Sequence, residues 1–185
     1  MRPDPLRDKH PVSDKRRTRF SASSLRGFRL LRQGIFPACR LESTADQTIT
    51  TATVTKVAFN QARYDSPGDE GGGDAGAKMA DLTNNDIIIR QSGLYIVSAG
   101  IYFATNTTGR RALLVQSGST TIIYDERNPI TASAVQTPVQ ASAAIVLARG
   151  DLIRANAFHT RGSDLDIEEV SGGSFPYLSV AWVAL

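Results

Sequence analysis

Two residue types that build many catalytic and metal sites are scarce in this sequence. Its 185 residues contain one cysteine, Cys39, and two histidines, His10 and His159. A single cysteine excludes an intrachain disulfide framework and a zinc site built on a cysteine pair. Two histidines argue against a histidine-rich metal site or acid–base site. No stretch approaches the ~18 consecutive apolar residues of a membrane-spanning helix, so we expect a soluble chain with no membrane partner.

Signatures of catalysis are scarce too. Cys39, at the expected start of the first strand, and His159, at the end of a late one, have no local signature of a nucleophile and its base. Carboxylates for a glycosidase pair are abundant but lack a distinguishing context. No glycine-rich phosphate loop precedes a helix. We therefore predict that the protein is not an enzyme and that it uses no cofactor and no dedicated metal.

Acidic residues are almost missing from the first part of the chain. Residues 1–40 carry 11 Lys and Arg but only 3 Asp, a net charge of +8. The other 145 residues carry 10 basic and 15 acidic side chains, a net charge of −5. A length of 185 residues suits one ordinary domain with an appendage better than a multidomain enzyme. We predict a basic N-terminal arm, residues 1–36, joined to an acidic domain, residues 37–185.

Beyond the arm, helical periodicity is lacking and short β-type runs take its place. Turn residues such as Ser117-Gly118-Ser119 and Arg149-Gly150-Asp151 separate the runs. The second turn also spells a tripeptide that adhesion receptors recognise, but a hairpin explains it better. Evenly spaced short strands with such punctuation are typical of an antiparallel sandwich or jelly roll. The expected strands are 54–59, 87–90, 94–103, 112–116, 120–124, 135–147, 152–158 and 177–185.

Two of the expected strands lack a polar face. In strand 94–103, Tyr95, Val97, Ala99, Ile101 and Phe103 alternate with Leu94, Ile96, Ser98, Gly100 and Tyr102. Strand 177–185 follows the same pattern. Because a sandwich strand in a monomer normally has one solvated face, two apolar faces indicate a second covering layer. A second copy of the chain in a closed ring, the arm, and covering loops are the alternatives.

Several short motifs follow one another in a recognisable order. They are Pro37-Ala38-Cys39-Arg40, Ser92-Gly93-Leu94-Tyr95, Gly109-Arg110-Arg111-Ala112-Leu113, Ala148-Arg149-Gly150-Asp151 and Phe175-Pro176-Tyr177-Leu178. This order resembles the trimeric jelly-roll family of complement globular heads and tumour necrosis factor. It is most similar to the version found in bacteriophage and bacterial virion and surface proteins. The resemblance covers about residues 37–185.

The resemblance implies an all-β, antiparallel, ten-stranded jelly-roll sandwich, here with an extended N-terminal arm. It also implies a tight homotrimer around a threefold axis with aromatic residues near that axis. The trimer-interface candidates are Tyr95, Tyr102, Phe103, Tyr177 and Trp182. The sequence departs from animal members of the family, because the arm replaces a Gly-X-Y collagen stalk.

Some members of that family bind calcium through acidic loops at the apex. The loop 66–80 is acidic and glycine-rich, and a second acidic group consists of Asp164, Asp166, Glu168 and Glu169. Neither has the fixed ligand spacing of a dedicated calcium site. We therefore expect solvated acidic loops at both places.

The arm combines a basic run with apolar residues. Four interpretations remain open: a targeting peptide, a nucleic-acid-binding arm, a disordered tail, and an anchor that lies along a larger assembly. The anchor is favoured and nucleic acid is not, because a net charge of +8 suits an acidic protein surface and the apolar residues add burial. The partner-binding candidates are Lys15, Arg16, Arg17, Arg19, Phe20, Leu25, Arg26, Phe28, Arg29, Leu31 and Arg32.

Together these features predict a phage virion structural protein. The main hypothesis is a homotrimeric capsid decoration or head-fibre knob, fastened by residues 1–36 to an acidic surface, most simply that of the major capsid protein. The alternative is a tail-tip or fibre-tip module that binds host-surface carbohydrate or protein, and a secreted bacterial binding module ranks third. We expect the protein in the virion, on the capsid exterior or the tail, after synthesis in the host cytoplasm.

Overall fold

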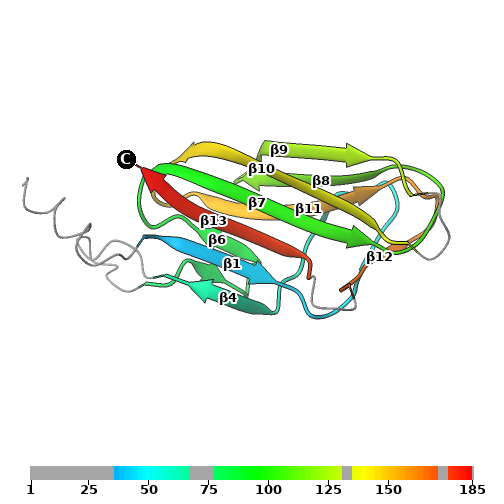
Figure 1. Ribbon diagram of the computed structural model, residues 1–185, viewed down its shortest axis with the longest axis horizontal. Coiled ribbons are helices and arrows are strands. Elements are labelled where there is room, and N and C mark those ends of the chain that lie inside the picture. The colour runs from blue at the N-terminus through cyan, green and yellow to red at the C-terminus, as the bar shows by residue number, and fades with distance from the viewer. Residues whose placement is uncertain (1–35, 67–76, 131–134, 171–174, 185) are drawn as a thin grey trace, which may run out of the picture. The chain divides into compact units, whose positions relative to one another are not determined.

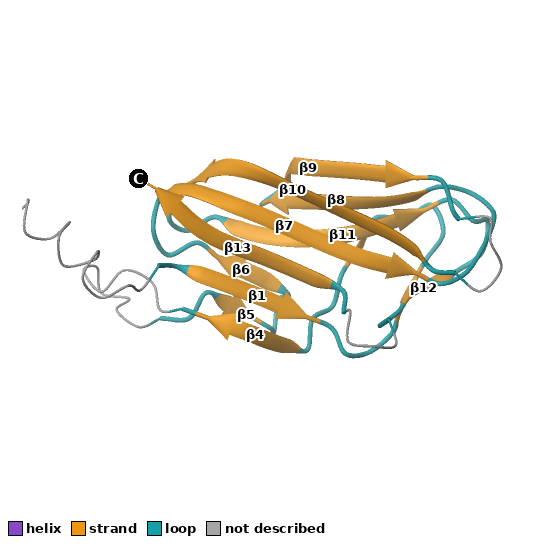
Figure 2. Ribbon diagram, viewed as in Figure 1, coloured by secondary structure: helices purple, strands orange, loops and turns teal. Residues whose placement is uncertain are grey.

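The structure is a computed structural model that describes residues 36–66, 77–130, 135–170 and 175–184. Every regular element among these residues is a β-strand (Figure 2), so the predicted all-β class is confirmed. None of the described segments forms a helix able to cross a membrane. The chain divides between residues 34 and 35 into two units. The predicted arm lies outside the described residues, except for Phe36.

Thirteen strand segments form two antiparallel sheets (Figure 1). Sheet A has the order β2-β12-β7-β13-β1-β4, and β10 also pairs with β7. Its strands are β1 (Ala38–Glu42), β2 (Gln47–Ile49), β4 (Gln61–Asp65), β7 (Gly93–Phe103), β10 (Thr137–Leu147), β12 (Leu165–Ile167) and β13 (Tyr177–Ala184). Sheet B has the order β5-β6-β11-β8-β9, and β3 also pairs with β11. Its strands are β3 (Thr55–Lys56), β5 (Ala80–Asp81), β6 (Asp86–Ile88), β8 (Arg111–Ser117), β9 (Thr120–Arg127) and β11 (Leu152–His159).

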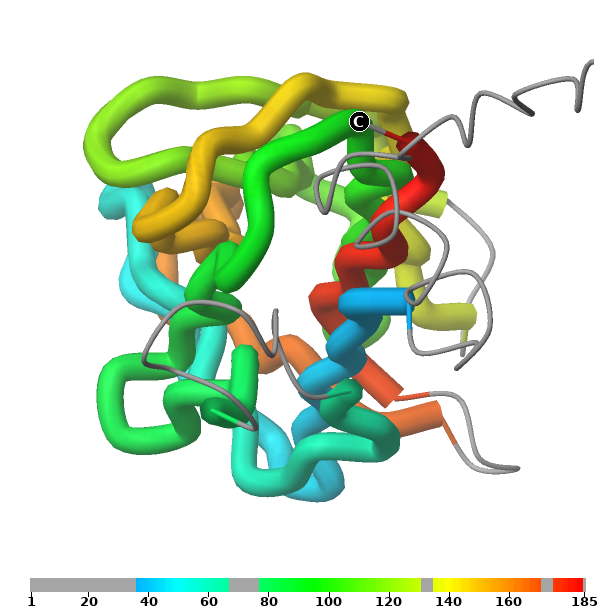
Figure 3. Tube along the Cα trace, turned by 90° about the vertical axis from the view of Figure 1, so that its left-hand side faces the viewer, coloured from blue at the N-terminus to red at the C-terminus, as the bar shows by residue number. Residues whose placement is uncertain are grey.

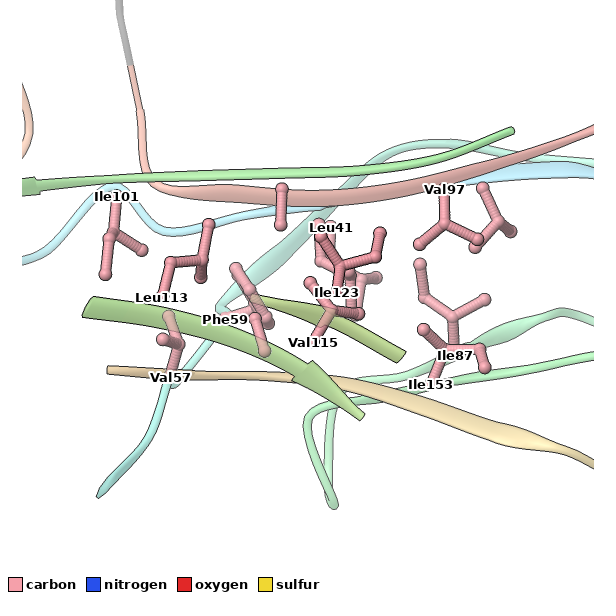
Figure 4. Packing of buried hydrophobic residues seen from close by; sticks show 14 of the residues in the cluster. Leu41, Val57, Phe59, Ile87, Val97, Ile101, Leu113, Val115, Ile123 and Ile153 are labelled. Carbon is pink, nitrogen blue, oxygen red and sulfur yellow. The ribbon is translucent and has the colours of Figure 1, made fainter. Parts of the chain in front are cut away.

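The hydrophobic core lies between the two sheets. Because side chains of a strand alternate between its faces, every second residue of β7 from Tyr95 to Phe103 is fully buried. Val97 and Ile101 project from sheet A toward Leu113 and Ile153 of sheet B (Figure 4). Seen from the end at which β13 stops, the strands of both sheets surround this interior (Figure 3). Each buried Å² of apolar surface contributes ~25 cal/mol, which makes the core the main force holding the sheets together.

The expected strands differ from the observed ones where side chains take over backbone hydrogen bonds. The run 54–59 contracts to β3, because the N–H groups of Ala58 and Phe59 donate to the side-chain oxygens of Gln47 and Asn85, at 2.8 and 2.6 Å. Strand β4 was not predicted, since its residues are mostly polar. Strands β2 and β12 have three residues each, too few to show a pattern. Together with β1 and β5, these three strands bring the eight expected ranges to thirteen strand segments among the described residues, where the resemblance implied ten strands.

Of the two predicted hairpin turns, the one at Gly118 is confirmed, because β8 and β9 are paired, whereas the one at Gly150 is wrong, since β10 pairs with β7 in sheet A and β11 belongs to sheet B. Gly118 connects β8 and β9 with φ +59, and Gly150 connects β10 and β11 with φ +95. Both values lie in the left-handed region that glycine adopts without a steric penalty. The carboxylate of Asp151 accepts a hydrogen bond from the N–H of Ala148 at 2.9 Å. Arg149-Gly150-Asp151 therefore forms a turn whose acidic side chain is used within the turn.

Candidate functional site

The outer face of sheet A is the surface of β10, β7, β13 and β1 that points away from the core. At one end it is apolar. Ile96 of β7 is 48% exposed and Val146 of β10 is 79% exposed, and the small side chain of Ala144 is paired opposite Ile96. Val183, in the bulge at the end of β13, is 49% exposed. Large apolar side chains so close together on a sheet surface mark a face that favours burial against protein.

Small hydroxyl side chains form the middle of the same face. Ser142, Ser98 and Ser179 stand opposite one another on β10, β7 and β13. The hydroxyls of Ser98 and Ser142 share a hydrogen bond of 2.9 Å, and the Ser179 hydroxyl donates to the carbonyl of Ser98 at 3.4 Å. Their hydroxyl groups are hydrogen-bonded within this row, and their small side chains form a flat surface.

The other end of the outer face is polar but internally paired. The Arg40 guanidinium lies 4.0 Å from the ring centroid of Tyr177 and donates to the carboxylate of Glu42 at 2.7 Å. A cation over an aromatic face is attracted by the ring quadrupole. The amide of Gln140 donates to the hydroxyl of Tyr102 at 2.9 Å. The charges at this end are thus partly neutralised before any partner arrives.

The ring of Tyr177 lies against β7 at Gly100, which has no side chain. A Cβ on Gly100 would lie 2.6 Å from Cε1 of Tyr177 and 3.1 Å from Cγ of Gln140. Real Cβ atoms do not approach so closely, so this glycine is required for the ring to lie against the sheet. Burial raises the pKa of Tyr177, the charge of Arg40 opposes that shift, and Tyr102 adds to it. The phenol therefore stays neutral well into the alkaline range.

The five predicted aromatic interface residues occupy three different places. Tyr102 and Tyr177 lie on the outer face of sheet A, half-buried. Tyr95 and Phe103 are fully buried between the sheets, because they fall on the inward positions of β7. They belong to the core and are not accessible to a second chain. Trp182 packs partly against the core at the end of β13 and stacks on Phe36, with ring centroids 5.7 Å apart.

Sequence reasoning singled out aromatic residues and missed the aliphatic ones. Ile96 and Val146 are the most exposed large apolar residues of β7 and β10, yet neither was a candidate. The signal was present, since Ile96 lies on the second apolar face of strand 94–103. Arg40 and Glu42 also escaped notice, because only the pairing of β1 with β13 brings them beside Tyr177.

The two side chains considered for nucleophilic catalysis lie far apart. Cys39 is in register with Val180, which is in register with Val97 of β7. The His159 ring contacts Phe103, six residues farther along β7, which corresponds to ~20 Å at ~3.3 Å per residue. Burial raises the pKa of the Cys39 thiol to about 12, and the charge of Asp65 adds to this shift. The thiol is neutral and enclosed, unlike a catalytic cysteine.

The acidic residues near the end of the chain differ in their surroundings. Glu168 accepts a hydrogen bond from Gln136 at 2.6 Å, and Asp164 is exposed. Within the described residues, no three His, Cys, Asp or Glu side chains are grouped closely enough to hold a metal ion. Most of the glycine-rich loop 66–80 lies outside the described residues, as do all the predicted arm residues from Lys15 to Arg32.

Solved structures with the same arrangement of strands exist despite very different sequences. The Eiger TNF structure from S. frugiperda has a TM-score of 0.55 and 11% identity, and the match covers 80% of this chain and 93% of that one. The fold is a tumour-necrosis-factor-like jelly roll. The globular domain of the zebrafish complement 1qA protein matches with a TM-score of 0.49 and 13% identity, over 77% of this chain and 94% of that one. The sequence matches no protein-family model and no curated protein.

Proposed function

We propose that this jelly roll is a homotrimeric knob of a phage virion, attached to the shell through its basic N-terminal arm as a capsid decoration or head fibre. The observation that supports a trimer is the outer face of sheet A, where Ile96 of β7 and Val146 of the neighbouring strand β10 are exposed. A closed ring covers such a face on every copy at once. The tumour-necrosis-factor-like fold supports this mode of association, since the family that the sequence resembles is trimeric.

The charge distribution supports attachment to another protein. A segment with a net charge of +8 is attracted to an acidic surface, and apolar residues such as Phe20, Leu25 and Phe28 add ~25 cal/mol per Å² that they bury. The acidic surface proposed is that of the major capsid protein. Three arms on one trimer raise the local concentration for one another, so three weak contacts yield stable attachment. The virion assignment rests on the motif order that resembles phage and bacterial virion proteins.

The oligomeric state is tested by light scattering of the full chain. A trimer has about three times the monomer mass of 19.9 kDa. We expect that mass at micromolar concentration and above, because each copy would bury the apolar end of this face. A monomer at these concentrations contradicts the proposal.

Attachment is tested by measuring how much protein binds purified shells. Replacing Lys15, Arg16, Arg17 and Arg19 by Gln should abolish occupancy and leave the trimer intact. The matched control replaces Asp4, Asp8 and Asp14 by Asn, which keeps the basic residues and should preserve binding. Unchanged occupancy in the first variant would exclude an electrostatic anchor. Binding of that variant to host cells, with shell binding lost or not, would favour a receptor-binding tip.

A further inference from the structure

The chain enters β1 through two residues, Phe36 and Pro37, which we call the arm junction. The antiparallel pairing of β1 with β13 places this junction beside the end of β13, where Trp182 lies. The rings of Phe36 and Trp182 are stacked, with centroids 5.7 Å apart and an angle of 15° between their planes. Trp182 is the single tryptophan of the chain. An aromatic contact therefore attaches the arm junction to the folded domain.

The backbone of the arm junction is restricted as well. The ring of Pro37 holds its own φ at about −65° and confines the preceding residue, Phe36, to an extended conformation. Pro37 is buried, and its carbonyl accepts a hydrogen bond from the N–H of Trp182 at 2.9 Å. The next residue, Ala38, is already in register with Ala181. Few backbone torsions thus remain free between the sheet and Phe36, and the stack restricts the side chain beyond them.

The position of the Trp182 ring depends on the neighbouring strand β7. A Cβ on Gly93 would lie 2.4 Å from Nε1 and 3.0 Å from Cδ1 of the indole. Since real Cβ atoms do not approach a ring so closely, position 93 must lack a side chain for Trp182 to lie there. Trp182 also packs against the hydrophobic core. The ring that Phe36 contacts is therefore held in place by the fold itself.

A tryptophan at this position has a cost. Its Nε1 is buried and has no hydrogen-bond partner, although the large majority of buried polar atoms in proteins have one. A phenylalanine would fill the space without an unpaired N–H. Phe36, in turn, is 47% exposed, so its ring adds little to the core. Core packing alone explains neither ring, and what the two rings share is their contact with each other.

We propose that the stack of Phe36 on Trp182 is a rigid joint that fixes the direction of the chain at the arm junction. The use of this joint rests on the proposed attachment of a trimer to a shell. Three arms that start in fixed, symmetry-related directions reach their sites together, whereas arms with loose junctions must be aligned one by one during binding. Phe36 is thus a positioning residue for the arm, separate from the basic residues that contact the partner.

The size of the effect follows from the strength of one aromatic pair. Such a pair shifts a conformational equilibrium about fivefold beyond the effect of its buried area. If each of three arms loses this factor, the affinity of the trimer for shells falls about a hundredfold, which is the product of three factors of about five.

The joint itself is tested by nitrogen NMR relaxation of the full-length protein, through the order parameter of the amide of residue 36. A rigid backbone has an order parameter of about 0.85, and a flexible one has a value below about 0.6. We expect residue 36 to be rigid in the wild type and in Phe36→Tyr, which can still stack, and flexible in Phe36→Ala. Quenching of Trp182 fluorescence by acrylamide should increase in Phe36→Ala, because one face of the indole is uncovered.

Tyr124→Ala is the matched control for these measurements. It removes an aromatic ring that is 54% exposed on β9, and it should leave residue 36 rigid. An order parameter in Phe36→Ala equal to that of the wild type would overturn the proposal, since Pro37 alone would then fix the junction. A flexible residue 36 in the wild type would overturn it as well.

Shell binding tests what the joint does. At concentrations where light scattering shows trimers of every variant, Phe36→Ala should bind purified shells about a hundredfold more weakly than the wild type. Phe36→Leu keeps an apolar side chain for direct contact with the shell but cannot stack, so it should bind as weakly as Phe36→Ala. Tyr124→Ala should bind as the wild type does.

Unchanged shell affinity in Phe36→Ala, or full binding by Phe36→Leu, would refute the role of the joint in attachment. A wild type that does not bind shells would contradict the proposed function instead. The order parameter of residue 36 would then still decide whether the joint exists, because it is measured on the protein alone.

Discussion

The outer faces of the two sheets have the same backbone pattern but opposite surface chemistry. On sheet B, side chains of neighbouring strands form a polar network: Asn156 donates to Gln116 at 3.0 Å, and Asp86 is held by Lys56 and Arg154 at 2.7 and 3.2 Å. On sheet A, the outer face instead holds Ile96, Val146 and a row of serines. A face built of mutually paired polar groups is stable in water, whereas an exposed aliphatic one gains from being covered.

The difference lies in what each face gains from burial against protein. Sheet B pairs charges between neighbouring strands, although Tyr124 and Leu152 are also exposed there. Sheet A confines its ion pair, Arg40 with Glu42, to one end and leaves the other end apolar. A partner that covers sheet A must be polar at one end and apolar at the other. A second copy whose strands run in the same direction meets this requirement, because its polar end would lie beside the polar end and its apolar end beside the apolar end.

The largest effect should come from placing a charge on the apolar end. Ile96→Asp would bury a carboxylate in the proposed interface, at a cost of several kcal/mol, so we expect self-association to weaken by at least about a hundredfold. Tyr124→Asp on β9 is the matched control, since Tyr124 is 54% exposed and Ile96 is 48% exposed. Sedimentation over a range of concentrations measures both. Equal loss of association in the two variants would show that the two faces do not differ in function.

The ion pairs of the two faces should differ in their contribution to stability. In Arg40→Ala, Glu42 keeps the hydrogen bond from Gln61 but loses its cationic partner while its side chain is only 6% exposed, so we expect a loss of about 2 kcal/mol. Arg110→Ala breaks a pair on sheet B whose side chains are 50% and 31% exposed, and should cost less than about 1 kcal/mol. Urea unfolding of both variants compares them. Similar losses would mean that the polar end of sheet A is as well hydrated as sheet B.

A smaller effect concerns the inner side of sheet A at alkaline pH. Burial raises the pKa of Cys39 to about 12, so the thiol of the unfolded chain ionises first, near its ordinary pKa of about 8.5. The contribution of the thiol to stability is fully present below about pH 8.5 and is lost as the pH rises toward the folded value, by about 1.4 kcal/mol at about pH 9.5. Thermal unfolding of Cys39→Ala should show a correspondingly weaker alkaline decline. If the alkaline loss of stability were unchanged in Cys39→Ala, other groups would cause it. One such group is Tyr95, because burial also raises the pKa of its phenol to about 12.

Much of the fold could be predicted because local sequence dictates it. The alternation in strand 94–103 divides the residues of β7 correctly between its two faces, Gly118 marks a real hairpin, and Gly150 marks a turn that leads from sheet A to sheet B. Strand β4 could not be found in this way, since a polar edge strand is defined by its partner β1 and not by its own composition.

The candidate site depends on pairings that local sequence does not encode. Ile96 comes to lie beside Ala144 only through the register of β7 with β10, and Arg40 meets Tyr177 only through the pairing of β1 with β13. The sequence also shows that residues 94–103 have two apolar faces without showing which one is inside. Tyr95 and Phe103 therefore looked as suitable for an interface as Tyr102, and the packing of sheet B against sheet A decides between them.

The smallest expected effect separates packing on sheet A from backbone strain on sheet B. Gly100→Ala would displace the ring of Tyr177, because the new Cβ would lie 2.6 Å from Cε1, and we expect association to weaken about fivefold, equivalent to ~1 kcal/mol. Gly118→Ala meets no atom within 4 Å, but its φ of +59 costs ~1 kcal/mol of folding stability. The first variant should therefore change the concentration dependence of the trimer and the second should change only the unfolding midpoint. If Gly100→Ala left association unaltered, the Tyr177 end of sheet A would lie outside the interface, and the apolar end alone would carry the contact between copies.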